Sequence, residues 1–443
     1  MSRVNIIGAG LAGSLLAIYL AKRGMEVDVF EARGDMRLEE VAAGRSINLA
    51  LSDRGIGALR EVGMDGFMLA EAVPMYGRMI HSPSGEQKLL PYSGRKGEYI
   101  NSVSRAGLNI ALLDEAEKYP QVKLHFNEPC RGYEAEAGKV LFAGGKAIFA
   151  DVLMATDGAG SVIRQSMEDQ VSEFHSSSVF LDHGYKELHI PAGDGGDFQL
   201  QKNALHIWPR HQFMMIALPN IDGSFTCTLF LAKNGPESFE GLSSEAAVTE
   251  FFDDEFSDAF HLMPTLLEDF FQNPIGDLGT VQCSPWHIGG KGLLLGDAAH
   301  AMVPFYGQGM NCAFEDVRVL DSLLSAKEVD WEVVFREFSA LRKPNADAIQ
   351  EMAEENFYEM RDRVADRVFQ RKRELETKLE QNYPEYFSKY SMVAFRENMP
   401  YAAAKAKGNA QDAFLMEFCR NLESVANVDL DELIIRMKKE ITV

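Results

Sequence analysis

The feature that constrains this chain most is a glycine-rich turn placed directly after its first apolar segment. Residues 4–7 predict a short buried strand, and Gly8, Gly10 and Gly13 follow before an apolar helical pattern begins. Gly8 permits a tight turn, Gly10 lets a pyrophosphate approach the backbone, and Gly13 lets the helix pack closely on the strand. Phosphates would then lie at the helix N-terminus, so the turn indicates a dinucleotide-binding βαβ unit.

A second predicted strand, at residues 26–30, leads to an acidic residue. Glu31 lies at the distance past the glycines where a carboxylate binds the hydroxyls of an adenosine ribose. An acid there disfavours a ribose 2′-phosphate, so the pocket is expected to hold FAD or NAD rather than NADPH. The uncharged residues 4–21 are also long enough for a membrane helix or a signal peptide. The glycines interrupt a continuous helix, however, and no small-residue cleavage pattern follows.

Two later segments place acidic residues after predicted strands. Residues 147–154 predict one buried strand that leads to Asp157, and Arg164 follows at a reach suited to a phosphate or a loop carboxylate. Residues 292–295 predict another buried strand, and Asp297 lies at its end, where open α/β sheets bind ligands. Its carboxylate can accept hydrogen bonds from a ribityl chain. With the glycine turn, these segments indicate one flavin held by three distant parts of the chain.

The residues after Asp297 form an uncharged loop that leads into a helix. Residues 301–314 carry no formal charge, and Met310, Ala313 and Val317 begin one helical face. The helix is expected to start at residues 309–311. Its N-terminal amides can then face the flavin pyrimidine and stabilise negative charge on the reduced flavin. A structural turn before a core helix would explain the glycines, but not the aromatic and glutamine residues beside them.

Composition limits the class of protein. The 443 residues, of which 46% are hydrophobic, are enough for two or more domains with a large interior. The 44 basic and 66 acidic residues give a net charge of -22, which opposes binding to nucleic acid or to an anionic membrane. The five cysteines are widely spaced without metal-ligand spacing, so we expect reduced thiols, no metal and a cytoplasmic protein. The C-terminal pattern is an amphipathic, charged helix, and no membrane anchor is expected.

The middle of the chain predicts a second, antiparallel sheet. Residues 78–81 and 87–92 flank a turn and predict a β-hairpin inserted into the nucleotide domain. Four further strands are expected at residues 186–190, 204–208, 213–218 and 225–231, separated by turn signals. From Trp331 onward a helical region is expected, broken by Pro344, Pro384 and Pro400, with the basic residues 371–373 on its solvated face.

The fold class is therefore α/β: a doubly wound, Rossmann-like FAD-binding domain, an antiparallel-sheet substrate domain and a C-terminal helical cap. The expected division assigns the FAD-binding domain to 1–72, 101–180 and 281–328, the substrate domain to 73–100 and 181–280, and the helical region to 329–443.

Taken together, these residues resemble the class A flavoprotein aromatic hydroxylases. Several motifs are similar to the branch of that family that hydroxylates kynurenine, and the likeness runs to about Phe395. These motifs are GRSINLALS at 44–52, RMIH at 78–81, LHIWPR at 205–210, FMMIALP at 213–219 and PFYGQGMN at 304–311.

The resemblance implies roles for particular residues. Arg78 and Tyr92 would bind the carboxylate of an amino-acid substrate, with Asn356 and Tyr390 completing the polar end. Met360 is spaced i, i+4 from Asn356 and would face the same pocket. Phe305, Tyr306 and Gln308 would lie beside the substrate ring and the flavin edge, although the family often has a phenylalanine where this chain has Tyr306. The residues implied or expected to contact FAD are Gly8, Gly10, Ala12, Gly13, Glu31, Arg33, Ala50, Arg105, Asp157, Asp297, Met310 and Asn311.

The implied reaction is an NADPH-consuming hydroxylation. FAD is reduced by transiently bound NADPH, reacts with O2 to a flavin hydroperoxide, and transfers one oxygen to the ring carbon ortho to the amino group of L-kynurenine. The expected partners are the small-molecule substrate and O2, with a homodimer as the candidate assembly. Two alternatives stay open: a hydroxylase of a phenolic acid such as salicylate, and a noncatalytic flavin-binding sensor. A flavin halogenase is disfavoured because the tryptophans, Trp208, Trp286 and Trp331, form no pair.

Overall fold

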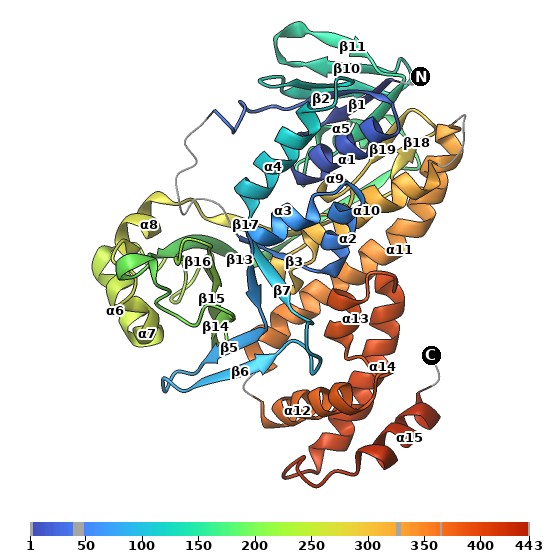
Figure 1. Cartoon of the computed structure of the whole chain (residues 1–443). Helices are drawn as coiled ribbons and strands as arrows, with labels where there is room; N and C mark the ends of the chain where they lie inside the picture. Colours follow the sequence, from blue (N-terminus) through green and yellow to red (C-terminus); the bar gives the residue numbers. More distant parts are fainter. Residues whose placement is uncertain (1–2, 39–47, 325–328, 364–365, 442–443) are drawn as a thin grey trace.

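The computed structural model describes residues 3–38, 48–324, 329–363 and 366–441, so residues 44–47 of the first motif lie outside the described part. Two large β-sheets, two smaller ones and a helical region make up the described part of the molecule (Figure 1). The sheet with the N-terminal strand lies at one end, beside the small sheet that contains β10 (Lys139–Phe142) and β11 (Ala147–Phe149). Helices α12 (Arg367–Asn382) to α15 (Leu430–Glu440) lie at the other end. The long helix α11 (Trp331–Tyr358) runs between these ends.

The first sheet is doubly wound and mostly parallel, as the sequence predicts. Its order is β18-β19-β12-β1-β2-β8, and only β18 pairs antiparallel. The central strands are buried on both faces because helices cover them, which explains their mostly apolar sequence. The strands are β1 (Arg3–Ile7), β2 (Glu26–Phe30), β8 (Val122–His125), β12 (Val152–Ala155), β18 (His287–Ile288) and β19 (Gly292–Leu294). The helices beside them include α1 (Leu11–Lys22), α4 (Arg105–Glu117), α5 (Val162–Gln170), α9 (Asp297–His300) and α10 (Gly309–Leu323).

The second sheet has seven strands in the order β17-β13-β16-β15-β14-β5-β6. The predicted hairpin is confirmed: β5 and β6 pair antiparallel, with Arg78 opposite Leu90. A short parallel pairing of β5 with β14 joins the hairpin to the sheet, with Leu205 opposite Arg78. The strands are β5 (Gly77–His81), β6 (Gln87–Pro91), β13 (His175–Ile190), β14 (Leu205–Arg210), β15 (Phe213–Pro219), β16 (Phe225–Ala232) and β17 (Gly276–Ser284).

Helices α6 (Glu245–Glu255), α7 (Ser257–Phe260) and α8 (Leu266–Gln272) bury one face of this sheet in a separate apolar core. Strands β13 and β17 cross the expected domain boundaries at 180 and 280, because both pair within the second sheet. The division into domains stays a prediction.

Two three-stranded sheets complete the β structure. One contains β3 (Asn48–Leu51), β7 (Ile100–Ser104) and β4 (Val73–Met75); the other contains β9 (Cys130–Glu134), β10 (Lys139–Phe142) and β11 (Ala147–Phe149). The prediction of one strand over residues 147–154 is wrong. The chain leaves β11 after Phe149, exposes Asp151 and enters β12 in a different sheet. The amide of Ala150 donates to the Gly138 carbonyl at 2.8 Å and fixes this break.

The C-terminal region is helical, as expected, with one difference at Pro344. This proline lies within α11, which continues through it. Pro344 is exposed while Arg342 and Ala346 are buried, so packing of the inner face holds the helix across the missing hydrogen bond. The remaining elements are a π-helical turn (Glu359–Arg363), α12 (Arg367–Asn382), α13 (Lys389–Phe395), α14 (Tyr401–Arg420) and α15 (Leu430–Glu440); helices α2 (Asp53–Glu61) and α3 (Asp65–Ala70) lie earlier in the chain. Short 3-10 turns lie at Ala143–Gly145, Asp194–Gly196 and Pro304–Tyr306.

The basic run on α12 is not a solvated face, which corrects the sequence interpretation. Lys372 is only 4% exposed and lies 3.0 Å from Glu376 and 2.5 Å from Asp412 of α14. Arg373 Nη1 donates to Glu376 at 2.8 Å. The two helices therefore meet through the ion pair of the buried Lys372 with Asp412, which comes from a distant part of the sequence. Within the described ranges, the helices lack the combination of length and apolar character needed to cross a membrane.

Candidate active site

One cavity of about 930 Å³ connects the first sheet to the second. It begins at the glycine turn after β1, passes the ends of β12 and β19, and reaches the inner face of the seven-stranded sheet. Its far end lies at Arg78 on the hairpin, with Tyr390 of α13 beside it. Cavities for small organic ligands span about 300–1,000 Å³, so this one can hold a large ligand.

The glycine turn leaves the start of α1 open to the cavity. Gly8 has a φ of 101°, and a Cβ there would lie 2.5 Å from the carbonyl oxygen of Thr156. A Cβ on Gly10 would meet nothing within 4 Å, and the first turn of α1 has neither an acidic residue nor a side-chain cap. The amides of α1 are therefore free to bind phosphate groups. Gly8, Gly10 and Ala12 line the cavity, whereas a Cβ on Gly13 would collide with the Gly8 carbonyl, so Gly13 serves helix packing.

Glu31 is a buried carboxylate fixed at the end of β2. Its Oε2 accepts a hydrogen bond from the Ala9 amide at 2.9 Å, and its Oε1 accepts from the Arg33 amide at 3.0 Å and Nε at 2.8 Å. Burial alone would raise the pKa of Glu31, but the bonds from Arg33 and Ala9 outweigh burial and lower that pKa. Glu31 is thus ionised at neutral pH, with remaining lone pairs for ribose hydroxyls.

One carboxylate oxygen of Asp157 has no hydrogen-bond partner among the described residues and can accept a bond from a ligand. Its Oδ2 accepts from the Val162 amide at 2.9 Å, while its buried Oδ1 has no hydrogen-bond partner among the described residues. Burial raises the pKa of this carboxyl. Asp297, at the start of α9, is exposed and lines the cavity. Ala50, Arg105 and Met310 also line it, so these expected flavin contacts are brought together. A ligand with hydroxyl groups and phosphates, such as FAD, fits this wall.

Three expected site residues lie behind the wall. Within the described residues, the Arg164 guanidinium donates to the main-chain carbonyls of Ala298, at 2.8 Å, and Ala159 rather than to a loop carboxylate. Gln308 is 2% exposed and outside the cavity lining, so the expectation that it lies beside the substrate ring is not met. The side chain of Asn311 donates to the carbonyls of Ala50, at 2.7 Å, and Gly307, at 2.9 Å. Arg164 and Asn311 therefore hold the loops through main-chain carbonyls, while Gln308 accepts a hydrogen bond from the Tyr401 hydroxyl at 2.9 Å.

Arg78 and a group of tyrosines form the other end of the cavity. The Tyr92 and Tyr390 rings stack at 4.9 Å between centroids, and Tyr390 lies 5.6 Å from Tyr306. The guanidinium carbon of Arg78 is 5.2 Å from the centre of the Tyr390 ring. Nε of Arg78 and Oη of Tyr92 are buried without a hydrogen-bond partner among the residues described. Burial raises the pKa of Tyr92, Tyr306 and Tyr390, so all three hydroxyls stay neutral donors.

Asn356 and Met360 meet, as their spacing predicts, although Met360 lies in the π-helical turn after α11. Asn356 Nδ2 donates to the Phe305 carbonyl at 2.6 Å and lies 3.2 Å from Met360 Sδ. Met360 and Phe305 line the large cavity. Asn356 lines a smaller adjoining cavity with Arg78, Tyr92 and Tyr390, so the structure brings it to the polar end, and its amide also holds the loop that carries Phe305.

Sequence reasoning missed Glu359 and the apolar wall. Glu359 lies 3.8 Å from Arg78 Nη1, and the signal for it was its place beside Met360 on the same predicted helix. The apolar wall is formed by alternating residues on the inner face of the seven-stranded sheet, and period-two patterning in the predicted strands could have found it. Its members include Leu205, Ile216, Leu218 and Phe230.

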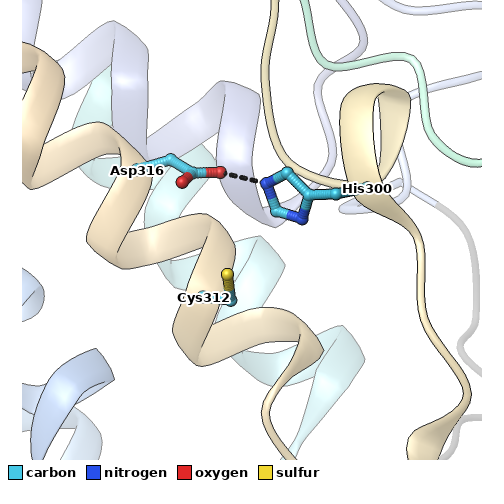
Figure 2. A group of neighbouring side chains, drawn as sticks. All are labelled: His300, Cys312 and Asp316. Atoms are coloured by element: carbon cyan, nitrogen blue, oxygen red, sulfur yellow. Dashed lines mark hydrogen bonds and ion pairs between the residues drawn. The ribbon is translucent and has the colours of Figure 1, made fainter. Parts of the chain in front are cut away.

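Figure 2 shows a buried cluster of His300, Cys312 and Asp316 whose side chains have the composition of a metal site. Asp316 accepts hydrogen bonds from His300 Nε2 at 2.6 Å, Arg342 Nε at 2.6 Å and the Gly296 amide at 3.2 Å. The Arg342 guanidinium also contacts Cys312 Sγ at 3.3 Å. A fixed cation therefore already neutralises the carboxylate, and the cluster ties α9, α10 and α11 together.

Comparison with known proteins supports the flavin interpretation. Residues 1–331 match the family model described as an FAD binding domain. The chain is 48% identical over 433 residues to the kynurenine 3-monooxygenase of Myxococcus xanthus, covering 96% of this chain and 93% of that protein. The enzyme of the same name from Dictyostelium discoideum is 44% identical, covering 97% of each chain.

Solved structures share the fold. The tetrameric form of 2-methyl-3-hydroxypyridine-5-carboxylic acid oxygenase matches with a TM-score of 0.68 at 20% identity, covering 89% of this chain and 96% of that one. Klebsiella pneumoniae HpxO, complexed with FAD and uric acid, matches with a TM-score of 0.67 at 20% identity over 85% of this chain and 93% of its own.

Proposed function

This chain belongs to the family of FAD-dependent kynurenine 3-monooxygenases, and from that membership we propose that it converts L-kynurenine to 3-hydroxykynurenine with NADPH and O2. The observation that carries the proposal is the single cavity that runs from the open N-terminus of α1 to Arg78. A flavin and an aromatic amino acid can therefore lie in one continuous space. A tryptophan-degrading pathway is the metabolic setting that this reaction implies.

FAD would be held by the glycine turn, Glu31, Asp157, Asp297 and the start of α10. When bound, FAD supplies the acceptor for hydride from NADPH and the site at which O2 is activated. The protein supplies position and enclosure. The partial positive charge at the N-terminus of α10, which begins at Gly309, stabilises negative charge on a ligand that faces it.

The substrate's amino-acid end would bind at Arg78. A guanidinium can form paired hydrogen bonds with a carboxylate, and the neutral hydroxyls of Tyr92 and Tyr390 add directional donors. This assignment uses the buried Nε of Arg78 and Oη of Tyr92, which lack other partners among the described residues. The aromatic ring would then extend towards Phe305 and Tyr306, against the apolar wall of the second sheet.

The chain's own residues therefore bind, orient and exclude water, and no acid-base triad is required. The amino group on the substrate ring already activates the neighbouring ring carbon for oxygen transfer. Enclosure by Phe305, Phe230 and Met360 limits the access of water to the reacting atoms. Asn356 fixes the loop at residues 304–309 from beside the polar end, and Gln308 contributes from behind the wall.

A single assay tests the proposal. The purified, FAD-loaded protein is mixed with NADPH, air and either L-kynurenine or salicylate, and the products are identified by mass. We expect kynurenine to gain one oxygen atom. Salicylate-dependent NADPH oxidation without a kynurenine product would favour a phenolic-acid hydroxylase. Retention of FAD with no substrate-dependent oxygen consumption would favour a flavin-binding sensor.

The cysteines support a reducing cellular compartment. All five are free, and all except Cys130 are buried. Burial raises the pKa of Cys130 to about 11, so its thiol stays protonated at neutral pH. Five unpaired thiols are typical of cytoplasmic proteins, and we place this enzyme in the cytoplasm.

A further inference from the structure

A tyrosine of the C-terminal helical region is hydrogen-bonded to the loop that forms the aromatic wall of the cavity. Tyr401 is the first residue of α14, and its Oη donates to Oε1 of Gln308 at 2.9 Å. Tyr401 is 0% exposed and Gln308 is 2% exposed, so water does not compete for this bond. Gln308 lies directly before α10 and follows the turn of Phe305 and Tyr306.

Tyr401 is itself held rigidly by a buried arginine. Arg54 of α2 is fully buried, and its guanidinium carbon lies 3.9 Å from the centre of the Tyr401 ring. Arg54 Nε donates to the Val393 carbonyl at 2.7 Å, and Nη2 donates to the carbonyls of Arg396 and Met399, both in the connection from α13 to α14. Arg54 Nη1 also donates to Glu315 of α10 at 2.8 Å. The guanidinium thus fixes the start of α14 against the flavin-binding part of the chain.

The tyrosine hydroxyl is separable from this packing. Burial raises the pKa of Tyr401 well above its usual value, so the hydroxyl is a permanent donor. A phenylalanine would keep the ring beneath Arg54 and lose only the bond to Gln308. Other side chains also anchor the loop: Ser52 Oγ lies 3.5 Å from the same Oε1 of Gln308, Asn311 binds the Gly307 carbonyl at 2.9 Å, and Asn356 binds the Phe305 carbonyl at 2.6 Å.

We propose that Tyr401 is a positioning residue that couples the C-terminal helical region to the aromatic loop at residues 304–309. Through Gln308 it holds Phe305 and Tyr306 at the distance that keeps the reacting ring enclosed. This inference rests on the proposed function. With the ring enclosed, kynurenine, NADPH, H⁺ and O2 give 3-hydroxykynurenine, NADP⁺ and H2O. With the loop loosened, a larger share of the turnovers gives NADP⁺ and H2O2 from NADPH, H⁺ and O2, and kynurenine is left unchanged.

The test compares Tyr401→Phe with Tyr386→Phe in the full-length, FAD-loaded protein. Tyr386 is a matched control, because it is a buried tyrosine of the same region whose hydroxyl has no hydrogen-bond partner among the residues described. In Tyr401→Phe, backbone hydrogen exchange at residues 304–309 is expected to rise roughly 2- to 12-fold, the equivalent of one lost buried hydrogen bond. The H2O2 produced per NADPH is expected to rise, with FAD content and kynurenine affinity unchanged. Tyr386→Phe should match the unmodified protein in all four measurements.

A second variant removes the bond from the other side. Gln308→Met removes the acceptor of Tyr401 and also that of the longer bond from Ser52, so it is expected to give exchange and H2O2 changes at least as large as those of Tyr401→Phe. Adding Tyr401→Phe to Gln308→Met is expected to change little, because the acceptor is already gone. Gln308→Met carries the test if Tyr401→Phe does not fold. Unmodified exchange at residues 304–309 and an unmodified H2O2 share in the folded variants would overturn the proposal. If kynurenine is not hydroxylated by any form, the proposed function fails, and the exchange measurement still decides whether Tyr401 positions the loop.

Discussion

Replacing Arg78 tests the assignment of the cavity's polar end most directly. In Arg78→Met the side chain keeps most of its length but loses its charge and its donors. Only 13% of the Arg78 side chain is exposed, so a carboxylate bound there is largely desolvated. Removing one partner of such a buried, hydrogen-bonded charge pair costs about 2–5 kcal/mol. At about 1.4 kcal/mol for each tenfold change, the dissociation constant for kynurenine is expected to rise between roughly 30-fold and several thousand-fold.

Arg78→Lys separates charge from geometry at the same position. Lysine keeps the positive charge but cannot present two parallel donors to a carboxylate. We therefore expect a rise in the dissociation constant that is smaller than in Arg78→Met. Arg336→Met is the control, because Arg336 is exposed on α11 and does not line the cavity.

The assay is a titration of the oxidised, FAD-loaded protein with kynurenine, followed by the change in the visible absorbance of the flavin. The flavin-to-protein absorbance ratio is measured on each variant and is expected to stay unchanged, because Arg78 lies at the end of the cavity opposite the glycine turn. A dissociation constant for Arg78→Met within about threefold of the unmodified value would refute the assignment. Loss of FAD in the same variant would instead show that Arg78 supports the fold.

Three further changes test other parts of the structure. Gly8→Ala would place a methyl group 2.5 Å from a carbonyl oxygen at a φ of 101°, and it should sharply lower the flavin-to-protein absorbance ratio. Gly66→Ala is the control, because a methyl group there meets nothing within 4 Å and the ratio should not change. Equal ratios in the two variants would contradict the close packing at Gly8. Lys372→Met removes a cation shared by Glu376 and Asp412, which keep Arg373 and Lys389 as their other partners, and should lower the free energy of unfolding by about 1.5–3 kcal/mol in a urea titration; no loss would show that the ion pairs of Lys372 do not stabilise the fold. Burial raises the pKa of Asp316, but its cationic partners outweigh burial and lower that pKa below its usual value. The unmodified protein should therefore have a higher free energy of unfolding than Asp316→Asn, by an amount that is constant at neutral pH and shrinks only below about pH 4. A difference already lost near pH 6 would contradict a lowered pKa of Asp316.

The parts of the fold that local sequence determines were predictable. The glycine turn follows β1 without a gap, and the hairpin that carries Arg78 is marked by a turn between two short strands. The break between β11 and β12 was not predictable, because residues 147–155 are mostly apolar and only pairing with two different sheets separates them. The burial of Lys372 depends on Asp412 of another helix, so a local charge run gave the wrong face.

The polar side chains of the candidate site also fall into two groups, those that local sequence identified and those whose role depends on distant parts of the chain. Asp157 and Asp297 were found because each follows a strand of the parallel sheet, where such sheets bind ligands. Gln308, Asn311 and Asn356 belong to residue types that suit a ligand, yet their amides bind main-chain or tyrosine groups of the surrounding loop. An amide serves either purpose equally well, and only the arrangement of distant helices decides between them.

The two ends of the cavity come from different parts of the chain, and this separates cofactor binding from substrate choice. The residues proposed to hold FAD all lie within 1–331, the range matched by the FAD binding domain model. Met360 and Tyr390, which line the other end, lie beyond that range, as does Tyr401 behind the wall. Solved structures with about 20% identity share the overall fold, so the scaffold tolerates wide sequence change. Differences in substrate among proteins of this fold should therefore concentrate in the hairpin and the C-terminal helices, since these elements form the polar end while the glycine turn must keep its shape.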